Sequence, residues 1–150
     1  MLTNRQNIRI EWGDCDPAGI VYFPRYFEFF DACTRALFER AGLFKRDMLK
    51  TYDIVGIPVV DMKATFKIAS RFGDDIVVDS SVTKWGTSSF VVHHLLLKGD
   101  AIAVECLETR VWAANRNGDP EQLEARSIPD AIKAKFDAAT RPQEKRPTRS

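Results

Sequence analysis

The strongest constraint on the fold of this chain is a long helical pattern that directly follows a turn rich in acidic residues. Across residues 24–41, apolar side chains recur at intervals of three and four, which predicts a helix with a wide apolar stripe. Pro24 suits a first helical position, and Gly42 stands where helices commonly end. A stripe this wide must be covered on several sides. It comprises Phe23, Tyr26, Phe27, Phe29, Phe30, Cys33, Thr34, Leu37, Phe38 and Ala41.

The segment before this helix is predicted to form a tight turn. Residues 14–19 contain two aspartates, a proline and a glycine, which all favour turns. The first N–H groups of a helix lack internal partners, so an acid placed there can act on a carbonyl group whose developing negative charge the helix stabilises. From the turn alone, a structural role for Asp16 is the simpler interpretation. We expect Asp14 to be a hydrogen-bonding turn residue and Cys15, which has no base beside it in sequence, to be a packing residue.

Most of the remaining chain has the alternating pattern of strands. One long helix followed by long strands with short connections predicts an α+β domain in which a curved antiparallel sheet wraps around the helix. We expect one domain over residues 1–138, a disordered tail at 139–150, and a homo-oligomer that extends the sheet across a two-fold axis. The predicted strands are 8–12, 61–68, 76–85, 89–98, 101–114 and 122–126, and the short helices are 46–49 and 129–138.

The composition narrows the class of protein. The 150 residues include 22 basic and 21 acidic side chains, a net charge of +1, which gives no argument for binding nucleic acid or an anionic membrane. Three scattered cysteines show neither zinc-site nor disulfide spacing, which favours a reducing compartment. No apolar run is long enough to span a membrane, and the N-terminus lacks the pattern of a signal peptide. We therefore expect a cytoplasmic protein with no metal ion and no membrane or nucleic-acid partner.

A longer motif carries a family resemblance. Residues 13–26, Gly-Asp-Cys-Asp-Pro-Ala-Gly-Ile-Val-Tyr-Phe-Pro-Arg-Tyr, resemble the motif that begins the central helix of hotdog-fold acyl-CoA thioesterases, closest to the 4-hydroxybenzoyl-CoA thioesterase branch. The likeness extends over residues 7–135. It implies a hotdog fold, assembly as a dimer or a dimer of dimers, and an active site between subunits.

The resemblance also implies roles for particular residues. Asp16, the second acid of the motif, would be the catalytic carboxylate and act on the thioester as nucleophile or as general base. The backbone N–H of Phe23 would bind the thioester oxygen, and Tyr22 would lie at the substrate. Asp31 has two interpretations: an ion pair with Arg35, four residues further along the helix, or an acceptor for a hydroxyl group on the acyl ring.

One stretch departs from the 4-hydroxybenzoyl branch. That branch would have basic residues after Trp85 to hold the CoA phosphates, but residues 86–88 are Gly-Thr-Ser. We therefore expect Lys84, Arg71 and Arg126 to serve instead, because phosphate contacts need charge more than fixed geometry. The resemblance thus predicts an enzyme that hydrolyses an aryl, or a short or medium acyl-CoA thioester to free acid and CoA, without a cofactor.

Two alternative functions remain at this level. A non-catalytic module that binds acyl thioesters would keep the groove without needing an acid in front of the helix. A hydratase or dehydratase on the same fold would need a positioned histidine, and neither histidine lies near the motif. His93 and His94 are neighbours on a predicted strand, so they point to opposite faces, cannot bind one metal ion together, and are expected to be structural.

Overall fold

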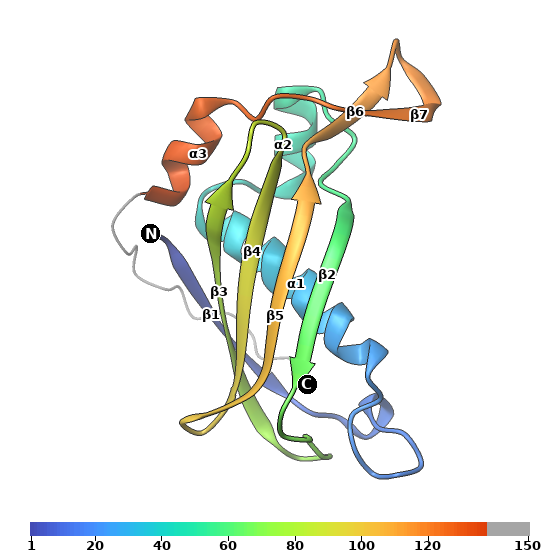
Figure 1. Cartoon of the computed structure of the whole chain (residues 1–150), viewed down its shortest axis with the longest axis vertical. Coiled ribbons are helices and arrows are strands. Elements are labelled where there is room, and N and C mark those ends of the chain that lie inside the picture. The colour runs from blue at the N-terminus through green and yellow to red at the C-terminus, as the bar shows by residue number, and fades with distance from the viewer. Residues whose placement is uncertain (138–150) are drawn as a thin grey trace.

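A computed structural model describes residues 1–137 and shows a five-stranded antiparallel sheet curved around one long helix (Figure 1). The helix, α1 (Pro24–Arg40), lies across the concave face of the sheet, as the predicted α+β hotdog architecture requires. The strand order is β1-β3-β4-β5-β2. The strands are β1 (Thr3–Arg9), β2 (Val59–Phe66), β3 (Asp75–Trp85), β4 (Ser89–Lys98) and β5 (Ala101–Val111).

Shorter elements close the two ends of the sheet. A 3₁₀ turn, η1 (Trp12–Asp14), precedes the loop to α1. The helix α2 (Lys45–Tyr52) follows α1. The strands β6 (Ala113–Arg116) and β7 (Asp119–Ala125) form a separate hairpin, and α3 (Asp130–Asp137) ends the described chain. The predicted tail at 139–150 lies outside the described residues.

Several predicted strands have the wrong bounds. β2 and β7 each begin and end earlier than predicted, and two other strands differ for a reason that the hydrogen bonds show. The first strand was expected at 8–12, but β1 ends at Arg9, opposite Asp75 at the start of β3. The Ile10 N–H still donates to the Asp74 carbonyl, and beyond it the β3 side of the pair turns away at Gly73. The chain instead turns into η1. The strand expected at 101–114 is divided at Trp112, whose N–H donates to the carbonyl of Ser88 rather than to a neighbouring strand of the sheet.

The core forms two clusters along α1. Phe29, Phe30 and Cys33 of its first half pack on the sheet with residues such as Ile76 and Leu96. Leu37 and Phe38 of its second half pack against Trp112, Phe136 and neighbouring side chains. Each large side chain buried in this way contributes about 2–3 kcal/mol. The apolar stripe read from the sequence is therefore the buried face of α1, except that Phe23 is exposed and Phe27 is half-buried.

The edge strand β2 leaves one side of the sheet open. Within residues 1–137 it pairs only with β5, and its register shifts between Val59 and Asp61. Pro58, directly before this strand, suits such a position, because proline in sheets is found at edges and bulges. Val60 and Phe66 expose much of their side chains. An unpaired edge with apolar side chains is well suited to pairing with another copy of the chain.

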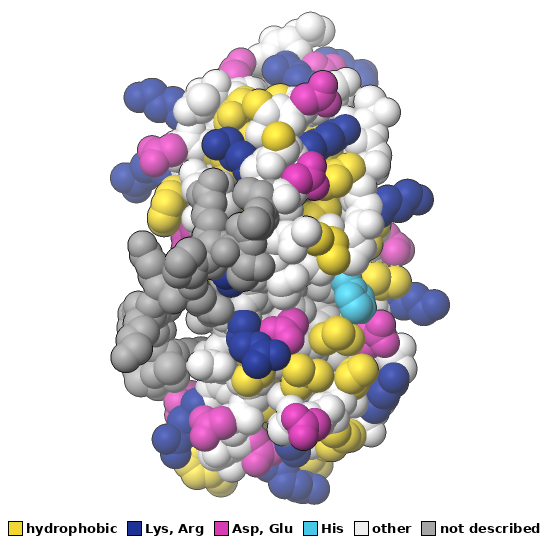
Figure 2. Space-filling model, turned by 90° about the vertical axis from the view of Figure 1, so that its left-hand side faces the viewer, with side chains coloured by type: hydrophobic (Ala, Val, Ile, Leu, Met, Phe, Trp, Pro, Cys, Tyr) yellow, Lys and Arg dark blue, Asp and Glu magenta, His cyan; other side chains and the backbone are white. Residues whose placement is uncertain are grey.

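The surface and the helices bear on possible partners. On the face shown in Figure 2, basic and acidic side chains are interspersed with hydrophobic ones. No helix within residues 1–137 is both long enough and apolar enough to cross a lipid bilayer.

Candidate active site

The turn that carries Asp16 is held by its own backbone. The Asp16 N–H donates to the Ile20 carbonyl at 2.9 Å, and the Gly19 N–H donates to the Asp16 carbonyl at 2.9 Å. The Asp16 Oδ1 accepts a hydrogen bond from the Ala18 N–H at 2.8 Å. Gly19 has φ of +81°, a conformation that glycine adopts without strain. These bonds leave Oδ2 of Asp16 without a hydrogen bond among the described residues.

Asp14 has a different role from Asp16. Its side chain is buried, and its Oδ2 accepts a hydrogen bond from the Glu11 N–H at 2.8 Å. Its carbonyl accepts from the Tyr22 N–H, also at 2.8 Å, which ties the start of the loop to the end of the loop. Asp14 is therefore the hydrogen-bonding turn residue that the sequence indicated.

The N-terminus of α1 has one unused donor close to this turn. Pro24 has no N–H, the Arg25 N–H donates to Tyr22, and the Tyr26 N–H donates to Phe23. The Phe23 N–H makes no hydrogen bond to any residue from 1 to 137. A free N–H at a helix N-terminus is a ready donor for a developing oxyanion. The predicted role of Phe23 stays a prediction, but its donor is available.

Arg71 is the candidate cation that lies beside the turn. Its Nη1 is 3.4 Å from the Gly19 carbonyl, and its own N–H donates to Asp74 at 2.8 Å. The neighbouring carbonyl of Ser70 accepts from the Val21 N–H at 2.9 Å. The loop between β2 and β3 is thus joined to the Asp16 loop, and Arg71 is brought within reach of a ligand there.

Lys84 and Arg126 lie at the other end of the sheet. Arg9 of β1, just before the Asp16 loop, pairs with Asp75 at the start of β3. Lys84 follows nine residues later on β3, about 30 Å away along an extended strand. Arg126 is held near that far end, because its N–H donates to the Trp112 carbonyl. One protomer therefore does not bring the three candidate phosphate ligands together.

Exposed aromatic side chains surround the Asp16 loop. Trp12 and Phe72 pack edge to face with ring centres 5.6 Å apart, yet both remain exposed. Tyr22 and Phe23 lie together, also at 5.6 Å and exposed. Phe66 of β2 packs partly on Tyr26 and leaves the rest of its ring open. A cluster of exposed apolar rings typically marks a binding surface.

The sequence did not reveal a buried polar network under α1. Arg110 of β5 is its centre: Nε donates to Glu108 Oε1 at 2.6 Å, Nη1 to the Ile57 carbonyl at 3.0 Å, and Nη2 to Asp31 Oδ1 at 2.9 Å. The signal available was two charged residues, Glu108 and Arg110, on the face of the strand that otherwise carries Val104 and Cys106. The predicted pair between Asp31 and Arg35 is wrong, because Arg110 reaches Asp31 from the sheet below.

The network continues to His94, whose ring stacks on Phe30. Thr34 donates to Glu108 at 2.6 Å and lies 3.2 Å from His94 Nε2, while Ser80 lies 2.7 Å from Nδ1. His94 faces the core and His93 faces outward to Glu105, so the two histidines lie on opposite faces as predicted. Both make structural contacts and neither lies at the Asp16 turn.

The charges in this network depend on its burial. Burial lowers the pKa of His94, which is therefore neutral at pH 7. Burial raises the pKa of Glu108, but hydrogen bonds and charge from His94 and Arg110 outweigh it and bring the pKa to about 2. His94 Nε2 is 3.7 Å from Glu108 Oε2, beyond hydrogen-bond length, so we assign most of this effect to Arg110.

We expect the free energy of unfolding to fall in two steps on acidification. Because the pKa of His94 is lowered from 6.5, the unfolded chain takes up that proton first, and stability declines below about pH 6.5. Because the pKa of Glu108 is lowered from 4.5 to about 2, its contribution is complete above pH 4.5 and is lost towards pH 2. Urea denaturation across this range measures both steps. A Glu108→Gln variant that still loses stability between pH 4.5 and pH 2 would contradict the assignment of this step to Glu108.

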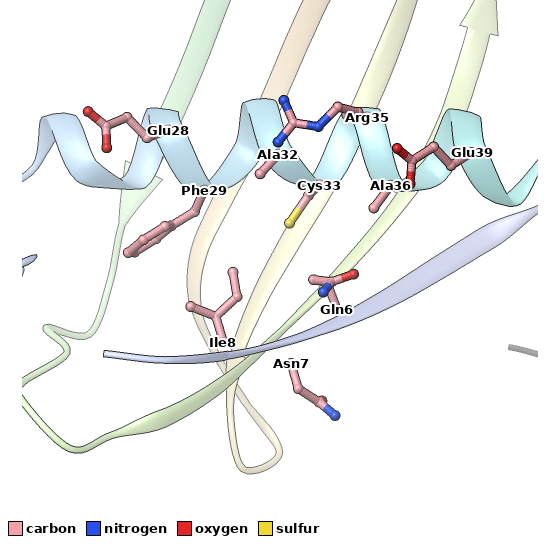
Figure 3. A pocket seen from close by; sticks show the side chains of 10 residues that line it. All are labelled: Gln6, Asn7, Ile8, Glu28, Phe29, Ala32, Cys33, Arg35, Ala36 and Glu39. Carbon is pink, nitrogen blue, oxygen red and sulfur yellow. The ribbon is translucent and has the colours of Figure 1, made fainter. Parts of the chain in front are cut away.

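A cavity outside the Asp16 turn lies elsewhere on α1. It measures about 460 Å³ and opens between α1 and β1 (Figure 3). Phe29 and Cys33 point from the helix towards Ile8 of β1. None of the residues predicted for catalysis or CoA binding lines this cavity, so it is not assigned to the thioester site. Burial raises the pKa of Cys33 to about 12, so its thiol is not a nucleophile at neutral pH.

Comparisons with known proteins agree with this architecture. A 4-hydroxybenzoyl-CoA thioesterase of Pseudomonas sp. strain CBS-3 is 37% identical over 127 residues, which cover 81% of this chain and 88% of that protein. A 1,4-dihydroxy-2-naphthoyl-CoA hydrolase of Synechococcus sp. strain WH7803 is 24% identical over 138 residues, which cover 87% of this chain and 86% of that protein.

A solved structure is also close. It is a 4-hydroxybenzoyl-CoA thioesterase in which one aspartate is replaced by asparagine, in complex with 4-hydroxybenzoyl-CoA. It superposes with a TM-score of 0.83 at 31% identity and covers 89% of this chain and 98% of that one. A family model described as the thioesterase-like superfamily matches residues 10–136. The chain therefore belongs to the thioesterase-like superfamily.

Proposed function

We propose that this protein is an acyl-CoA thioesterase that acts on an acyl group with a hydroxylated aromatic ring. Its family membership supports a thioester hydrolase. The observation that carries the proposal is the arrangement at α1: a carboxylate with one free oxygen, Asp16, stands in front of a helix whose Phe23 N–H has no acceptor among the described residues.

The chemistry follows from this arrangement. The Asp16 carboxylate either attacks the thioester carbonyl carbon or removes a proton from an attacking water molecule. In both routes negative charge develops on the carbonyl oxygen, and the Phe23 N–H and the dipole of α1 stabilise it. The CoA thiolate then leaves. The attack route passes through an anhydride that water hydrolyses, and neither route requires a metal ion or redox cofactor.

The acyl group is proposed from two observations. The two named relatives act on 4-hydroxybenzoyl and 1,4-dihydroxy-2-naphthoyl groups, which both carry ring hydroxyls. Asp31 lies eight residues beyond Phe23 on α1, about 12 Å along the helix axis. A hydroxybenzoyl group with a hydrogen bond at each end spans roughly the same length. Asp31 is therefore the proposed acceptor for the ring hydroxyl.

We propose that a second copy of the chain completes the site. The edge of β2 is open, and Phe66 of this strand and the aromatic rings at the Asp16 loop are exposed. Pairing of two such edges would extend the sheet and cover these rings. It would also allow Lys84 and Arg126 of one copy to approach the CoA phosphates bound at the other copy. Arg71 would contact the phosphates bound at its own copy.

Hydrolysis assays test the function. A panel of 4-hydroxybenzoyl-CoA, benzoyl-CoA and hexanoyl-CoA is expected to give the highest kcat/KM for the hydroxylated ring. Release of free thiol from every substrate at one common rate would remove the aromatic preference. Tight binding of all three without any release of thiol would instead favour the non-catalytic binding module.

A further inference from the structure

We propose that Arg110 is a positioning residue that fixes the Asp31 carboxylate for recognition of a hydroxyl group at the far end of the acyl group. The inference rests on the proposed function, because it assigns Asp31 to the acyl group. It adds a residue from β5, 79 positions away from Asp31 in sequence, that no part of the motif indicates.

The contacts of Arg110 leave it a single orientation. Three of its nitrogen atoms each donate to a different acceptor: the Glu108 carboxylate, the Ile57 carbonyl and the Asp31 carboxylate. Its side chain is only 7% exposed, whereas that of Asp31 is 61% exposed. The guanidinium is thus a fixed point inside the protein, and the carboxylate that it holds faces outward.

Glu108 explains why a guanidinium is stable there. Its side chain is fully buried, and its negative charge pairs with Arg110 at 2.6 Å. Thr34 donates to the same oxygen, Oε1, from α1. A buried charge is costly without a partner, so Arg110 cannot turn away to solvent without leaving Glu108 unpaired. The pair therefore restrains Asp31 through Arg110.

Asp31 keeps one oxygen available for a ligand. Arg110 binds Oδ1, and Oδ2 makes no hydrogen bond within residues 1–137. A cleft of about 40 Å³ lies against the pair, with Phe38 and Ile57 among its lining residues. A space of that size admits a small group, such as a hydroxyl, next to a carboxylate acceptor. A fixed acceptor in a partly apolar cleft favours a ring that carries a hydroxyl over one that lacks it.

The test compares two substrates that differ by one hydroxyl group. In an Arg110→Lys variant the positive charge remains, but the three-way geometry is lost. We expect the ratio of kcat/KM for 4-hydroxybenzoyl-CoA over benzoyl-CoA to fall about tenfold, with kcat/KM for benzoyl-CoA changed less than about twofold. A Glu108→Gln variant, which keeps Arg110 but weakens its anchor, is expected to lower the same ratio by a smaller factor.

A matched control separates positioning from general damage. Ser80→Ala removes a buried hydrogen bond to His94 at the far end of the network, so it is expected to lower stability and leave the ratio unchanged. An equal loss for both substrates in Arg110→Lys would overturn the inference, as would a wild-type enzyme that hydrolyses both equally well. If the wild type hydrolyses neither substrate, the proposed function fails, and the inference fails with it.

Discussion

Replacement of Asp16 by asparagine is expected to lower kcat for the preferred acyl-CoA by about a thousandfold. An amide neither attacks a thioester nor accepts a proton from water, and a positioned carboxylate contributes roughly 10²–10⁴ to the rate. The asparagine Oδ1 can still accept the hydrogen bond from the Ala18 N–H, so the turn should keep its shape. Steady-state assays of CoA release, with urea denaturation to verify folding, give the result.

The control is Glu28→Gln on the second turn of α1. Glu28 is exposed and pairs with Arg25, so the change removes one negative charge near the same helix N-terminus without touching the turn. Its kcat is expected to stay within about twofold of the wild type. Equal activity of Asp16→Asn and wild type would show that Asp16 is only a turn residue.

Replacement of Arg110 by methionine is expected to lower the free energy of unfolding by about 3–5 kcal/mol. The change leaves the buried Glu108 carboxylate without its charged partner, and an unpaired buried charge costs about this much. Urea denaturation measures the effect, and an unchanged m value would show that the two-state analysis still applies.

Two further variants make the measurement specific to the ion pair. Arg35→Met makes the same substitution at an exposed arginine that has no ion pair among the described residues, and is expected to change stability by less than about 0.5 kcal/mol. The double variant Glu108→Gln with Arg110→Met should recover part of the loss, because no charge then remains unpaired. Strictly additive effects of the two substitutions would contradict the coupling.

Much of the fold could be predicted because local patterns agree with it. The aromatic periodicity of residues 24–41 gave α1 almost to the residue, and alternation gave the long strands β3 and β4. The acidic turn could be predicted from its aspartates, proline and glycine, whose backbone preferences act over a few residues. Strand ends were less accurate, since the end of β1 depends on where β3 begins rather than on its own residues.

The sequence by itself determined the turn in front of α1, most of the buried stripe of that helix and the hydrogen-bonding role of Asp14, because each depends on neighbours within one or two turns of chain. Only the tertiary structure decided the partner of Asp31. Sequence proximity favoured Arg35 as that partner, but an ion pair between two solvent-exposed side chains adds little to stability. Arg110 prevails because the sheet holds its guanidinium in place, and that depends on strand pairing between residues far apart in the chain.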